Sequence, residues 1–129
     1  MKDKAKEFAV GLLVALWAVF TPIHSILYVV MSLVLADFIT GIYKAKRKRE
    51  SITSNRMRHT SGKLIGYVIL ICAGFGLDHL AGQDSLFFAR AFAVLIAGIE
   101  IKSLDENLRD VTGVNVWEII KDRLKPPPK

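Results

Sequence analysis

The sequence predicts an all-α integral membrane protein with four short transmembrane helices and a C-terminal amphipathic helix in the cytoplasm. Hydrophobic residues make up 52% of the 129 residues, and the mean hydropathy is +0.36, which is high for a soluble protein. The chain is also basic, with a formal net charge of +6. These two properties are segregated, because the basic residues cluster between long uncharged stretches. This pattern is typical of a multi-spanning membrane protein, so we expect the lipid bilayer as a partner.

The first apolar stretch is too long for one membrane crossing. Residues 8–43 contain no lysine or arginine. As a single helix they would extend about 54 Å, against about 30 Å for the hydrocarbon core. Pro22 is the natural break, because proline removes a backbone donor and clashes with the preceding turn. We therefore predict helices over about residues 5–21 and 23–43, joined in a tight hairpin, with one kinked helix as the alternative. No signal-peptide cleavage pattern follows the first lysines, which indicates a retained membrane segment.

Two further apolar stretches predict the third and fourth helices, over about residues 64–81 and 86–102. Both are near the lower length limit for a span and would need tilt, snorkelling or local thinning of the bilayer. The four helices make up an expected transmembrane domain over residues 1–102, with a basic cytoplasmic loop over 44–63. Residues 103–129 are expected to form a charged and amphipathic cytoplasmic tail.

The tail contains one short segment with helical periodicity. Val116, Ile119, Ile120 and Leu124 share one helical face, and the charged residues lie largely off it. The segment ends at three consecutive prolines, which cannot continue a helix. Its apolar face suits either the membrane surface or a neighbouring subunit.

The distribution of lysine and arginine predicts the topology. The N-terminal segment has three, the 44–63 loop has eight, the tail from Lys102 has six, and the two other connections have none. By the positive-inside rule, both termini then lie in the cytoplasm. Six basic residues are expected at the membrane surface, in contact with anionic lipid: Lys44, Lys46, Arg47, Lys48, Arg49 and Lys63. A nucleic-acid patch is the competing interpretation, and we do not expect it because the flanking segments are predicted to cross the membrane.

Asp37 is an acidic residue inside the second apolar stretch. An ionised carboxylate is costly at that depth unless it faces protein or water, so it is a functional candidate. The alternative is a structural ion pair, with Lys63 as the favoured partner and Lys102 as the second. Ser25, Ser32 and Thr40 share one face of the same helix, which could pack against another helix or line a narrow aqueous path.

Small residues predict further close packing between helices, at Ala89, Ala93 and Ala97 and at Gly62 and Gly66. The residues do not form a catalytic set. The three histidines lie in different segments, and the single cysteine, Cys72, lies in an apolar run. We therefore expect neither an enzyme nor a bound cofactor or metal.

The segment Glu100-Ile-Lys-Ser103-Leu-Asp-Glu106-Asn107 resembles the E-x-x-S-x-x-E-N signature of the phage lysis and toxin-secretion holins. That family also has an acid and a glycine late in an early transmembrane helix, followed by basic residues. Asp37-Phe-Ile-Thr-Gly41 and the basic run 44–49 are similar to this pattern. The chain departs from it at Trp117, where the family pattern has proline. The resemblance covers residues 30–120, and relatives include the holin of clostridial large-toxin gene clusters.

The resemblance implies a multi-pass protein of the bacterial inner membrane that forms homo-oligomers. It implies lesions that release a peptidoglycan hydrolase or export a large protein such as a toxin. Glu100, Ser103, Glu106 and Asn107 would then form a hydrogen-bonded cytoplasmic collar after the fourth helix; an exposed, charged helix end is the alternative. Two other functions stay open: a non-lytic scaffold subunit of a secretion or envelope complex, and a narrow ion channel that uses Asp37.

Overall fold

The computed structural model describes residues 2–52, 54–82 and 84–126. Within these ranges the chain forms α-helices, one short 3₁₀ helix and no strand. The elements are listed in chain order: α1 (Lys2–Val19), η1 (Thr21–Ile23), α2 (His24–Arg47), α3 (Ser54–Leu80), α4 (Phe87–Thr112) and α5 (Val116–Leu124). The all-helical class predicted from the sequence is therefore confirmed.

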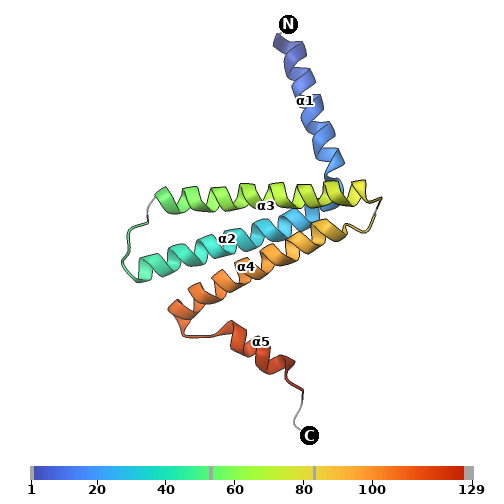
Figure 1. Cartoon of the computed structure of the whole chain (residues 1–129). Coiled ribbons are helices and arrows are strands. Elements are labelled where there is room, and N and C mark those ends of the chain that lie inside the picture. The colour runs from blue at the N-terminus through green and yellow to red at the C-terminus, as the bar shows by residue number, and fades with distance from the viewer. Residues whose placement is uncertain (1, 53, 83, 127–129) are drawn as a thin grey trace.

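Helices α2, α3 and α4 pack into a bundle, and α4 contacts both of the others (Figure 1). Helix α1 projects away from one end of this bundle, and α5 turns back from the end of α4 (Figure 1). All of α1 is exposed, and it has no buried residue. The close packing expected between the first two helices is not seen, because α1 points away from α2 (Figure 1), and the membrane crossing of α1 stays a prediction. Pro22 lies in η1, whose single turn redirects the chain without returning α1 along α2.

The bundle core is a narrow apolar strip that follows helical spacing. The strip consists of Ile23, Val30, Val34, Ile71, Phe75, Ala89 and Ile96. Most large apolar side chains instead face outward, such as Leu35 and Leu95, which are 58% and 65% exposed. A soluble bundle would bury such residues, so this surface is suited to lipid or to other protein chains.

Two helical stretches are long and apolar enough to cross a membrane, 21–47 and 56–80. They correspond to the second and third predicted spans. The other two expected spans fall in α1 and α4, which carry more charged residues, and they stay a prediction. The C-terminal helix forms as α5, and its contact with the membrane surface is likewise a prediction.

The helices extend beyond the apolar stretches that predicted them. Helix α2 continues to Arg47 and α3 begins at Ser54, so most of the loop expected over 44–63 is helical. Helix α4 continues to Thr112, and the left-handed Gly113 then ends it. The reason is that lysine, arginine and glutamate are good helix formers, so a change from apolar to charged residues does not end a helix.

Asp78 near the end of α3 forms hydrogen bonds with the start of α4. Its carboxylate is fully buried and accepts hydrogen bonds from the backbone N–H groups of Phe88, at 2.9 Å, and Ala89, at 3.1 Å. These are free donors of the first helical turn, and a negative charge there is favourable to the helix dipole. The connection between α3 and α4 is therefore closed by a buried charged cap.

Gly74 brings the backbones of α3 and α4 into close contact near that cap. A Cβ atom at Gly74 would lie 2.9 Å from the backbone nitrogen of Ala89 and 2.7 Å from Cδ2 of Phe92. Ala89 is fully buried, as its predicted role in packing requires. In contrast, Gly62 and Gly66 have no atom within 4 Å of such a Cβ, so they make no close helix contact within the chain.

Candidate functional site

Six polar side chains converge inside the bundle, at the end where α2 finishes and α3 begins. This polar cluster consists of Asp37 from α2, Lys63 and Tyr67 from α3, and Glu100, Ser103 and Asn107 from α4. On each helix the nearest of these residues lies three or four positions from a buried apolar residue, and the others follow at the same spacing, so they share its core-facing side. The cluster therefore replaces the hydrophobic core at this end of the bundle.

Asp37 joins all three helices. Its Oδ1 accepts hydrogen bonds from the Ser103 hydroxyl, at 2.6 Å, and from the Asn107 amide, at 3.0 Å. Its Oδ2 lies 3.3 Å from the Lys63 ammonium. The side chain is 15% exposed, so these partners take the place of water around a carboxylate that burial would otherwise destabilise.

Glu100 is the most deeply buried member of the polar cluster, with no exposed surface. Its Oε1 lies 2.9 Å from the Lys63 ammonium and accepts a 2.7 Å hydrogen bond from the Tyr67 hydroxyl. Lys63 thus lies between two carboxylates. One positive charge and three neutral donors stabilise two buried negative charges, an arrangement that depends strongly on the lysine.

The structure contains the predicted pair of Asp37 and Lys63. Lys102, the second candidate partner, lies instead on the exposed side of α4. Tyr67 was missed from the sequence. Its position four residues after Lys63 is the signal that could have found it, because residues at that spacing share one helix face.

Three of the four signature residues, Glu100, Ser103 and Asn107, meet in the polar cluster, and Glu106 does not. Glu106 is exposed and lines a hollow of about 450 Å³ together with Lys102, Arg109 and Ile120. The helical repeat explains the difference, since residue 106 lies about 120° around the helix from residue 100. The three converging residues belong to α4 itself and not to a separate segment after it.

The hydroxyl groups along α2 bond mainly within their own helix. The Ser32 hydroxyl donates to the Tyr28 carbonyl at 2.8 Å, and the Thr40 hydroxyl donates to the Ala36 carbonyl at 2.9 Å. Ser25 and Ser32 are exposed on the bundle surface. The predicted polar stripe is therefore separate from the polar cluster, and its outer part is available to lipid, water or another subunit.

Gly41 lies beside the polar cluster. A Cβ atom at this position would be 3.7 Å from Nδ2 of Asn107, which is ordinary contact. Its carbonyl accepts a 2.8 Å hydrogen bond from the Arg56 guanidinium. Gly41 thus links the end of α2 to the first turn of α3.

Three of the basic residues expected at the membrane surface contact the end of α4, and their contact with lipid stays a prediction. The ammonium groups of Lys44 and Lys48 lie 2.7 Å and 3.1 Å from the Asp110 carboxylate. Arg47 donates a 2.8 Å hydrogen bond to the Val111 carbonyl, near the C-terminal end of α4. Lys46 and Arg49 are exposed and stay candidates for contact with anionic lipid.

The contact at Asp110 predicts a small pH effect on stability. Hydrogen bonds from Lys44, and then from Lys48, hold the pKa of the Asp110 carboxyl below its ordinary value. The stabilisation is therefore present above the ordinary carboxyl pKa of about 3.9 and is lost as the pH falls through the lowered value. Thermal unfolding in detergent from about pH 6 to about pH 3 should show a shallower loss for Asp110→Asn. Superimposable pH profiles for the two proteins would contradict this assignment.

A sequence model of the bacteriophage holin family matches residues 14–126. The match covers most of the chain and includes both candidate membrane spans and every residue of the polar cluster. The family consists of membrane proteins without enzymatic activity. No curated protein and no solved structure matches the chain.

Proposed function

The chain belongs to the bacteriophage holin family, and we propose that it oligomerises in the bacterial inner membrane and opens lesions there. These lesions would release a peptidoglycan hydrolase to the cell wall or export a large protein. The protomer would cross the membrane four times with both termini in the cytoplasm, as the distribution of basic residues predicts.

The observation that carries this proposal is the outward-facing apolar surface. Exposed apolar side chains occur on every helix from α1 to α4, such as Phe8, Ile39, Ile69 and Val94, which are 75%, 56%, 63% and 70% exposed. The apolar core behind them is narrow. In a bilayer this surface can contact lipid or other copies of the chain, which supports a protein that accumulates in the membrane and then associates laterally.

The polar cluster would stabilise the helix packing of the single protomer before assembly. Asp37 and Glu100 are occupied by contacts inside one chain, which favours a role in setting the packing of α2, α3 and α4. The exposed hydroxyl groups of Ser25 and Ser32 would then face neighbouring subunits, or water in an open lesion. This division gives the two sets of polar residues different expected phenotypes.

We expect Asp37→Asn to delay or abolish lysis in a bacterium that also expresses a cytosolic cell-wall hydrolase. The substitution removes the charge that Lys63 balances and weakens the bonds to Ser103 and Asn107. Culture density and release of a folded cytosolic reporter would be followed after induction, at matched membrane abundance. Asp3→Asn is the control, because it makes the same carboxylate-to-amide change at an exposed position on α1, outside the polar cluster.

The outcomes separate the proposed lesion from its rivals. Abrupt, hydrolase-dependent lysis with reporter release supports a holin lesion. Loss of membrane potential without reporter release would indicate a narrow ion channel. Normal growth with abundant membrane protein would contradict autonomous lesion formation and favour a scaffold subunit. Equal lysis by the wild type and Asp37→Asn would remove Asp37 from the mechanism.

A further inference from the structure

Two neighbouring hollows lie along α2 and α3, and the second also reaches α4. One is an apolar groove of about 350 Å³, lined by residues that include Tyr28, Met31, Val34 and Leu64. The other is a polar cleft of about 450 Å³, lined by residues that include Arg56, His59 and Lys63. Phe38 and Thr60 line both, so the cleft and the groove are adjacent, and together they are called the depression below.

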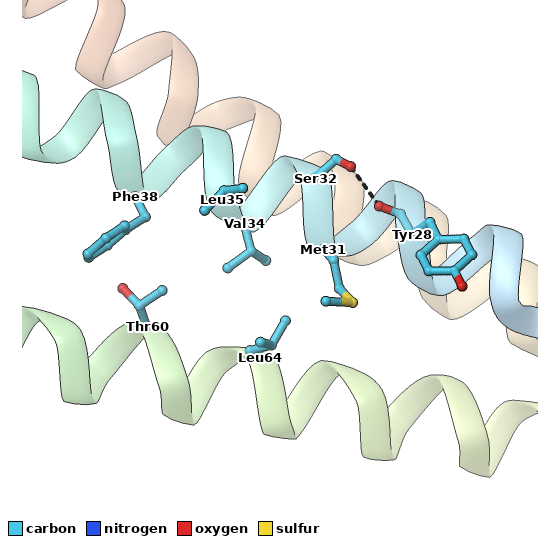
Figure 2. Close-up of a pocket in the computed structure, with 8 residues that line it drawn as sticks. All are labelled: Tyr28, Met31, Ser32, Val34, Leu35, Phe38, Thr60 and Leu64. Atoms are coloured by element: carbon cyan, nitrogen blue, oxygen red, sulfur yellow. Dashed lines mark hydrogen bonds between the residues drawn. The ribbon is translucent and has the colours of Figure 1, made fainter. Parts of the chain in front are cut away.

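The apolar groove has the dimensions of one acyl chain. Met31, Val34 and Phe38 extend from α2 toward Leu64 and Thr60 of α3 (Figure 2). The lining residues 28–38 of α2 span about 15 Å at 1.5 Å per residue. That length is about half of the roughly 30 Å hydrocarbon core, the depth that one lipid leaflet occupies. The groove also lies within the two helical stretches that are long and apolar enough to cross a membrane.

The polar cleft presents the Arg56 guanidinium and the His59 imidazole at one end of this groove, and it also contains Asp37, which is already bonded to Lys63, Ser103 and Asn107. Arg56 and His59 come from the first turns of α3, and both line the cleft. One guanidinium nitrogen of Arg56 donates to the Gly41 carbonyl at 2.8 Å, which positions the charge at the wall of the cleft. A guanidinium carries five N–H donors, so one such bond does not exhaust it. Lys63 is less available, because it lies between Asp37 and Glu100.

We infer that this depression binds an anionic phospholipid, with the phosphate at Arg56 and His59 and one acyl chain in the groove toward Tyr28. A basic pocket between membrane helices on the cytoplasmic side is suited to such a headgroup, and guanidinium bonds to phosphate are strong. A helix of a second copy would fill the apolar groove, but its apolar face would offer no acceptor to the Arg56 guanidinium, because the Asp37 carboxylate in the cleft is already bonded to Lys63, Ser103 and Asn107. The inference requires only that the chain lies in a membrane and is independent of lesion formation.

Native mass spectrometry of the detergent-purified full chain tests the inference. The probes are dioleoyl phosphatidylglycerol, dioleoyl phosphatidylcholine and glycerol 3-phosphate, which has the anionic group without acyl chains. We expect the wild type to retain phosphatidylglycerol about tenfold better than phosphatidylcholine, and Arg56→Gln to reduce this preference to near parity. Arg90→Gln removes the same charge at the other end of the bundle and should keep the preference.

A second variant tests the acyl chain separately from the headgroup. Met31 is 45% exposed in the groove, so Met31→Trp should fill the groove without overpacking the core. It should lower retention of both lipids about tenfold, while Leu95→Trp on the exposed face of α4 should not. Equal phosphatidylglycerol retention by the wild type, Arg56→Gln and Met31→Trp would overturn the inference. So would competition by glycerol 3-phosphate alone, or a dimer that Met31→Trp abolishes while lipid retention is unchanged.

Discussion

Replacing Lys63 with methionine is expected to lower the free energy of unfolding by about 3–5 kcal/mol, because removing one partner of a buried ion pair leaves an uncompensated charge. Here two carboxylates would be left. The Lys63 ammonium lies 3.3 Å from Asp37 and 2.9 Å from Glu100, and Glu100 has no exposed surface. Without the lysine, the two negative charges would repel each other in a region that water reaches poorly.

The loss can be measured as the thermal unfolding midpoint of the detergent-solubilised protein, followed by far-ultraviolet circular dichroism. Lys46→Met is the matched control, because it removes the same charge from an exposed position on α2. Adding Glu100→Gln to Lys63→Met should recover part of the lost stability, since it removes one of the two orphaned charges. Equal effects of Lys63→Met and Lys46→Met, or no recovery in the double variant, would show that the polar cluster does not stabilise the bundle.

The sequence predicted the contacts of those site residues whose depth in the membrane and spacing along a helix were both informative. Asp37 and Lys63 could be paired because each lies near the same predicted end of its helix, and a buried acid requires a partner. Glu100, Ser103 and Asn107 fall at three- and four-residue spacing, so their common face follows from the helical repeat. The same rule places Glu106 on another face of the helix, although the signature had grouped it with the other three residues.

Other features depend on the register between helices, which one sequence does not reveal. Asp78 falls near the end of the third predicted helix, and its spacing alone did not reveal that it is buried against the N-terminus of α4. The predicted packing glycines were Gly62 and Gly66 and not Gly74, because only the position of Ala89 on α4 makes Gly74 a close contact. The direction of α1 could not be predicted either, because two apolar helices gain little from contact with each other in lipid.

The two ends of the bundle are held by different interactions. At one end, charged and polar side chains join α2, α3 and α4 through Asp37 and Lys63. At the other end, α3 and α4 are joined by the Asp78 cap and by direct backbone approach at Gly74. Between them, the residues that the structure describes form the narrow apolar core. Substitutions at the two ends should therefore have separate and nearly additive effects on stability.

At the second end, Gly74→Leu is expected to cost about 3 kcal/mol or more, at the upper limit of overpacking effects. Even the Cβ atom would lie 2.7 Å from Phe92 and 2.9 Å from the backbone nitrogen of Ala89. The phenyl ring of Phe92 can rotate away, but the backbone of α4 cannot move without separating the helices. That separation would also lengthen the hydrogen bonds from Phe88 and Ala89 to Asp78, so packing and capping would be lost together.

Gly66→Leu is the matched control, because it makes the same substitution on the same helix where no atom lies within 4 Å of the added Cβ. Leucine is the better helix former by roughly 0.8 kcal/mol, so this variant should be neutral or slightly stabilised. Thermal unfolding in detergent would measure both, and amide hydrogen exchange would show whether protection falls first at residues 88 and 89. If Gly74→Leu were as stable as Gly66→Leu, α3 and α4 would not approach closely at this position. The buried Asp78 cap would then be the main contact between the two helices at this end of the bundle.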